Sequence, residues 1–206
     1  MQKIIFDDNY GLTDAVLQGR KIMTRRIAYD GEIEDLNIDY IIEGVDAWRL
    51  VLCDGILIVA KSKYRIGEVV DVAQSYKSIH EEMMNGDYGN SRYDAFRCAM
   101  VAGTKGWNNK MFVRADLMPH QIRITDIKAE RMQDISDEDC LKEGVVYDSR
   151  HWVNGFKVEN LWNKIDRQSH FRSAQVAFAN LINRISGKWT WKRNPYVFVY
   201  TFELVK

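Results

Sequence analysis

Four cations and one hydroxyl fall within seven consecutive positions of this chain, residues 20–26. The run follows Gly19, and glycine commonly ends a helix because it enters the left-handed conformation without a Cβ clash. In an extended segment Lys21 and Arg25 would face one side, and Thr24 would face the other. Such a run could hold a phosphate or a polar ring, or it could be the solvated surface of an edge strand.

A carboxylate that could join this run belongs to a second signature, more than a hundred residues later. Ser136 can cap a helix with Asp139 three positions on, and Gly144 can end that helix. Glu143 then falls in the last turn, where the helix dipole disfavours an anion. Its carboxylate is therefore either solvated or held by a cation.

Lys21, Thr24 and Glu143 together could supply a nucleophile and its base. A threonine hydroxyl needs a base to attack, and a lysine is a base only when it is neutral. Neighbouring arginines favour the neutral amine, whereas an ion pair with Glu143 would oppose it. Glu143 could instead act as an acid or base, or orient a substrate.

Other chemistries have weaker support in the sequence. The four histidines are scattered, and Cys53, Cys98 and Cys140 form no CxxC pair, so we expect neither a metal site nor a disulfide framework. The chain has no GxxxxGK[ST] or GxGxxG motif, and we expect no cofactor. The segment 107–110, Trp-Asn-Asn-Lys, has the composition of a binding loop, although an anchored loop also needs an aromatic residue.

The elements that must position these residues alternate short strands with a few helices. Strands are expected at 3–6, 24–29, 49–53, 55–60, 69–74, 121–131 and 196–204. Helices are expected at 12–18, at 91–102 with Ser91 as cap, at 137–143, and at 171–185 with Ser169 as a possible cap. Segment 30–46 is expected to be loop, 145–168 an irregular hairpin or loop, and 75–120 an insertion with much loop.

Length and composition indicate a packed globular protein, expected as one domain over residues 1–206 with a two-domain division as the alternative, and the expected strands and helices make its class α+β. The chain is 46% apolar, and its 29 basic and 29 acidic residues cancel, which argues against nucleic-acid binding by bulk charge. No signal peptide or membrane span is expected, since the longest apolar stretch is interrupted by Asp54. With an odd number of cysteines, a reducing cytoplasm is the expected location.

Four separated motifs resemble the ASCH domain family of the PUA-like superfamily, in particular its longer phage and bacterial members. The first is Gly19-Arg20-Lys21 followed by Thr24 and Arg26, and the family's usual first threonine is replaced here by Ile22. The others are the sequences YRIGE at 64–68, ISDEDCLKEG at 135–144 and NPYVFV at 194–199. The likeness spans nearly the whole chain, and segments 30–60 and 75–120 are covered least.

The resemblance implies a small mixed β-barrel of the PUA-like type, with flanking helices and inserted loops, and with the 75–120 insertion over a basic cleft. It implies binding of RNA or a modified nucleoside or nucleotide, with Arg20, Arg25 and Arg26 as ligand contacts and Trp107 stacking on a base. The alternative that it implies is an amidohydrolase acting on N4-acylated cytidines through Lys21, Thr24 and Glu143. Ribonuclease activity, also described in the family, is the less favoured alternative.

Overall fold

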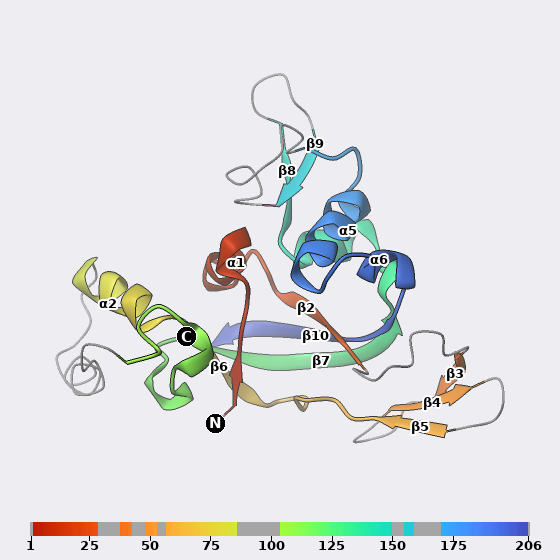
Figure 1. The fold of residues 1–206 in the computed structure, drawn as a ribbon, viewed down its shortest axis with the longest axis horizontal. Coiled ribbons are helices and arrows are strands. Elements are labelled where there is room, and N and C mark those ends of the chain that lie inside the picture. Colours follow the sequence, from red (N-terminus) through yellow and green to blue (C-terminus); the bar gives the residue numbers. More distant parts are fainter. Residues whose placement is uncertain are drawn as a thin grey trace.

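The computed structural model describes residues 2–28, 38–42, 48–52, 57–85, 104–149, 155–158 and 170–205. Its helices, including the short 3₁₀ turns η1–η4, are η1 Asp8–Tyr10, α1 Leu12–Leu17, α2 Tyr76–Asn85, η2 Lys110–Phe112, η3 Ala115–Leu117, η4 Met132–Asp134, α4 Asp137–Lys142, α5 Ala174–Ile185 and α6 Thr190–Arg193. Its strands are β1 Lys3–Ile4, β2 Met23–Ile27, β3 Ile38–Ile42, β4 Trp48–Leu52, β5 Leu57–Ala60, β6 Val69–Val72, β7 Gln121–Arg131, β8 Val145–Asp148, β9 Gly155–Val158 and β10 Tyr196–Val205. Figure 1 shows their arrangement.

A five-stranded sheet in the order β1-β6-β7-β10-β2 forms the centre of the fold. Only the β1–β6 pair is parallel, and β10 pairs with β7 on one side and β2 on the other. The apolar residues on both faces of β10 predict a central strand, and this prediction is confirmed. In the described residues β1 and β2 are edge strands that do not pair with each other, so the fold is α+β without a closed hydrogen-bonded barrel.

The helices α1 and α5 lie on one side of this sheet, above β2 and β10 in Figure 1. Buried aliphatic and aromatic side chains from α5, including Phe178 and Leu181, pack into the main core with residues from the sheet. Ser173 rather than Ser169 caps α5, accepting a hydrogen bond from the Val176 amide. The expected start at residue 171 was wrong because Phe171 pairs its backbone with Phe156 of β9 and so extends the neighbouring hairpin.

Two smaller sheets stand at the margins of the fold. The antiparallel pair β4–β5 confirms the hairpin expected on either side of residues 54–55, and β8–β9 confirms the hairpin alternative for the segment after residue 144. β3 also pairs with β4, so the expectation of loop throughout 30–46 was wrong for residues 38–42. Strand pairing supplied the backbone partners that the acidic, polar sequence did not suggest.

The 75–120 segment begins with α2, a helix that we did not expect. Ser75 caps it by accepting from the Ser78 amide, and the buried side chains Tyr76, Ile79 and Met83 follow helical spacing. They form a second apolar cluster with Val113 and Met118 from later in the same segment. The helix expected at 91–102 lies outside the described residues.

Candidate functional site

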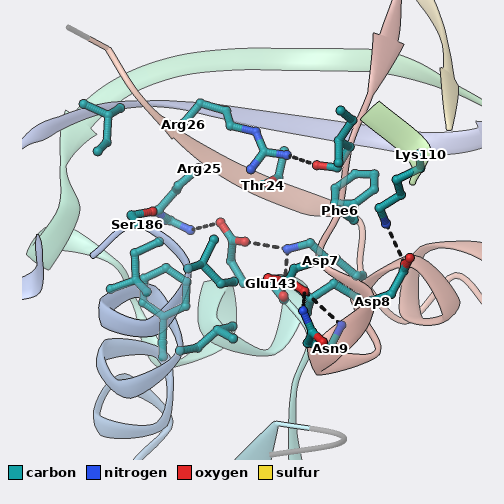
Figure 2. Close-up of a pocket in the computed structure, with 18 of the residues that line it drawn as sticks. Phe6, Asp7, Asp8, Asn9, Thr24, Arg25, Arg26, Lys110, Glu143 and Ser186 are labelled. Carbon is teal, nitrogen blue, oxygen red and sulfur yellow. Dashed lines mark hydrogen bonds and ion pairs between the residues drawn. The ribbon is translucent and has the colours of Figure 1, made fainter. Parts of the chain in front are cut away.

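A cleft of about 860 Å³ opens between β2, η1 and the C-terminal half of α5. This volume lies within the usual range of small-molecule sites. Figure 2 shows Arg25, Glu143 and Thr24 in it, with Asp7, Asp8 and Lys110 on one side and Ser186 on the other. Its lining contains all three residues of the expected triad, Lys21, Thr24 and Glu143.

The basic run is held in place by the C-terminal ends of two helices. Gly19 takes the left-handed conformation, with φ 70°, and the Lys21 amide then donates to Ala15 O of α1 at 2.9 Å. The next amide, that of Ile22, donates to Lys142 O at the end of α4 at 3.0 Å. Both contacts satisfy carbonyls that a helix end leaves without a partner. They bring the run to the helix that carries Glu143.

Lys21 and Glu143 form a buried ion pair at the floor of the cleft. Lys21 Nζ lies 2.6 Å from Glu143 Oε2 and donates to the main-chain oxygen of Glu143 at 2.7 Å. The ammonium group thus also compensates the negative end of the α4 dipole. Burial lowers the pKa of Lys21, and the attraction of Glu143 opposes this shift without cancelling it. Deprotonating Lys21 therefore costs less free energy than deprotonating a solvated lysine.

Arg25 holds the other carboxylate oxygen and joins it to two further acidic residues. Its Nη1 lies 3.0 Å from Glu143 Oε1, and its Nη2 lies 2.6 Å from Glu130 and 3.5 Å from Asp139. Burial would lower the pKa of this guanidinium, but Glu143 and Glu130 raise it. The side chain is fully buried. Expected as a ligand contact, Arg25 is placed by the structure where it orients Glu143.

Thr24 and Arg26 line the cleft from β2, and neither contacts a carboxylate in the described part of the chain. Thr24 is 97% buried, and its hydroxyl has no hydrogen-bond partner among the described residues. Arg26 donates to Ile5 O at 2.7 Å, and its guanidinium lies 5.7 Å from the centre of the Phe6 ring. A free hydroxyl and an arginine without a carboxylate partner are both available to a ligand.

Two expected ligand contacts lie elsewhere. Arg20 is not part of the cleft lining, and its Nε donates to Gln18 Oε1. Trp107 packs with the second apolar cluster, and its ring lies 6.0 Å from that of His80, so it serves as the anchor of the 107–110 loop. The polar residues that follow it, Asn108, Asn109 and Lys110, line the cleft instead.

Sequence reasoning missed two parts of the cleft. One is the acidic turn at η1, where Asp8 Oδ1 lies 2.6 Å from Lys110 Nζ and so closes the rim against the 107–110 loop. The other is an apolar wall from α5, which includes Phe178, Leu181 and Ile182. The helical periodicity of α5 indicated only that these side chains face inward. It could not show that the wall they form borders a cleft.

The described residues contain no group of three or more histidine, cysteine or acidic residues placed to hold a metal ion. None of the described helices is both long and apolar enough to cross a membrane. The chain matches no protein-family model, no curated protein and no solved structure.

Proposed function

We propose that the protein binds a nucleoside or a single nucleotide of RNA in this cleft. The observation that carries the proposal is the composition of its walls, which are apolar along α5 and cationic and polar along β2 and the 107–110 loop. A planar base can pack against apolar side chains while its edge forms hydrogen bonds with polar groups. Arg26 and the Thr24 hydroxyl supply donors for such an edge.

The four sequence motifs that resemble the ASCH domain agree with this proposal. We propose in addition that the central sheet is of the PUA-like barrel type. The strand order β1-β6-β7-β10-β2 leaves β1 and β2 as the two edges. Arg26 of β2 donates to Ile5 O, just after β1, so a side chain links the two ends of the sheet. The ligand would bind beside this link.

Calorimetric titration with cytidine and N4-acetylcytidine tests the binding proposal. We expect saturable binding, and we expect Arg26→Gln to weaken it by roughly tenfold, the effect of one lost charge-assisted hydrogen bond. Arg123→Gln is the matched control, because Arg123 is exposed, pairs with Glu203 and lies outside the cleft. Absence of binding for both nucleosides and for short single-stranded RNA would contradict the proposal.

Amide hydrolysis is a second candidate, favoured by the lowered pKa of Lys21 in the same cleft as the free Thr24 hydroxyl. Neutral Lys21 would take the Thr24 proton as the oxygen attacks the acyl carbon of an N4-acylated cytidine. The resulting ammonium would return the proton to the leaving amine, and water would hydrolyse the acyl-threonine. Glu143, held by Arg25, would keep the lysine oriented throughout.

The Thr24→Val and Thr24→Ser variants separate this chemistry from binding. Valine preserves the shape of the buried side chain, so we expect turnover of N4-acetylcytidine to fall at least about a hundredfold while the nucleoside still binds. Serine restores a hydroxyl and should keep measurable turnover. Wild-type protein that is inert towards a panel of acylated nucleosides would remove the hydrolase candidate and leave the binding proposal standing.

A further inference from the structure

A second pocket of about 280 Å³ adjoins the cleft. The two share three lining residues, Ile5, Arg26 and Ile27, so the Arg26 side chain borders both spaces. The remaining walls come from β1, from the 61–64 segment and from β10. It is a separate space from the one that contains Lys21 and Glu143.

The charge of this second pocket is entirely positive among its described lining residues. Lys3, Lys61, Lys63 and Arg26 line it, and no aspartate or glutamate does. Burial, followed by repulsion from Lys63, lowers the pKa of Lys3, so Lys3 and Lys63 are close enough to repel each other. Lys61 and Lys63 are exposed and form no ion pair with the described carboxylates. A cluster of cations without acidic neighbours produces a positive potential that attracts anions.

Hydrogen bonds hold two parts of the pocket wall, the Lys3 side chain and the backbone at Lys63. Lys3 Nζ donates to Met111 O at 2.8 Å and to Val113 O at 2.7 Å, which hold its side chain in one position. The buried Tyr200 hydroxyl accepts from the Lys63 amide at 3.1 Å and so anchors the 61–64 segment. A preorganised site loses less conformational entropy on binding than a flexible one.

We propose that the second pocket is a phosphate subsite, and that the ligand of the cleft is a nucleotide or an oligonucleotide rather than a free nucleoside. This inference rests on the proposed function, because the base would occupy the cleft while the phosphate lies beyond Arg26. Lys61, Lys63 and Arg26 can donate to the several acceptor oxygens of a phosphate, while Lys3, whose ammonium donates to main-chain carbonyls, contributes positive charge. The positive charge of the pocket then selects among ligands that share the same base.

The test compares N4-acetylcytidine with its 5′-monophosphate and 3′-monophosphate by calorimetric titration. We expect one of the monophosphates to bind wild-type protein at least roughly tenfold more tightly than the nucleoside, as charge-assisted hydrogen bonds would give. The Lys61→Gln/Lys63→Gln variant should lose that gain and leave nucleoside affinity unchanged. The matched control is Lys77→Gln/Lys192→Gln, which removes two exposed lysines that line neither pocket.

The outcomes separate failure of the phosphate subsite from failure of the proposed function. A nucleoside that binds as tightly as both monophosphates, or a gain that survives in Lys61→Gln/Lys63→Gln, overturns the subsite and leaves the cleft function intact. A gain that the control variant also loses overturns it too, because the effect would then be one of net charge. A monophosphate that binds when the nucleoside does not, and only with Lys61 and Lys63 present, supports the subsite. Failure of all three compounds to bind contradicts both proposals.

Discussion

The cations of the cleft floor and those of the second pocket differ in how their charge is compensated. Lys21 and Arg25 are almost fully buried and meet the carboxylates of Glu143 and Glu130 within 3.0 Å. Lys61 and Lys63 are exposed and meet none in the described residues. Both groups are basic in sequence, yet only the second has charge left to attract an anion.

The difference follows from the cost of removing charge from water. A buried ion is tolerated only with excellent partners, so the cations of the floor are matched by acidic residues from β7 and α4. These two cations fix the orientation of the Glu143 carboxylate, because one of its oxygens contacts Lys21 and the other contacts Arg25. Exposed lysines bear little desolvation cost and need no internal partner. The proposals above therefore use the floor to position Glu143 and the second pocket to attract an anion.

Removing Glu143 should give the largest effect on stability. Glu143→Ala leaves Lys21 and Arg25 without a shared buried anion, and we expect the free energy of unfolding to fall by about 3–5 kcal/mol. Urea denaturation measures this change. The double variant Glu143→Ala/Lys21→Met also removes one of the two unpaired cations, so it should recover part of the lost free energy of unfolding. A loss below about 1 kcal/mol for Glu143→Ala would mean that water can solvate Lys21 and Arg25 at the cleft floor, and that their burial does not require Glu143.

Adjacent arginines allow a direct comparison within one strand. Arg25→Gln removes the buried cation that Glu130, Asp139 and Glu143 share and leaves each of them only lysine partners among the described residues, so we expect a loss of about 3 kcal/mol in the free energy of unfolding. Arg26→Gln removes one hydrogen bond to Ile5 O and should cost about 1 kcal/mol, with its main effect on ligand affinity. Equal stability losses for the two variants would contradict the division between paired and unpaired cations.

Alkaline pH should weaken the fold through groups packed near each of the two sites. Burial raises the pKa of Cys140 on α4 to about 12 and that of Tyr64 beside the second pocket to about 12. A raised folded-state pKa gives stability that is complete below the unfolded pKa and is lost as pH rises through the folded value. The loss should begin near pH 9 for Cys140 and near pH 10 for Tyr64.

Urea midpoints measured from pH 8 to pH 11 test this expectation. Cys140→Ala should flatten the earlier part of the decline relative to wild type, and Tyr64→Phe should flatten the later part. Lys21 acts in the opposite sense, because its pKa is lowered, so each variant is compared with wild type at the same pH. If the urea midpoint declines with pH in the same way in all three proteins, neither Cys140 nor Tyr64 causes the decline.

The smallest stability effect is expected in the second pocket. Lys61→Gln/Lys63→Gln removes two exposed charges, one of which repels Lys3, so the free energy of unfolding should change by less than about 0.5 kcal/mol or increase slightly. The same urea measurement serves. A loss comparable to that of Arg25→Gln would indicate that these lysines have structural partners, and the comparison between the two regions would fail.

Local signals predicted those elements whose causes lie within a few residues. Ser136 accepts from the Asp139 amide, as the capping box required, and the strand at 121–131 was predicted with its observed limits. The helix α2 was missed although its cap, Ser75, is local, whereas in two other failures the deciding partner was distant in sequence. Phe171 pairs with Phe156 instead of entering α5, and β3 exists through its pairing with β4.

The sequence by itself determined the candidate residues Lys21, Thr24 and Glu143, because side-chain chemistry and helix-end signals are local properties. Only the tertiary structure decided which cations would be neutralised, since Glu143 reaches Lys21 across 122 positions and Glu130 reaches Arg25 across 105. It also placed Trp107 with the second apolar cluster and brought Lys61 and Lys63 into the lining of the second pocket. The sequence shows which side chains are charged, but their burial and ion pairing depend on which distant segments the fold brings together.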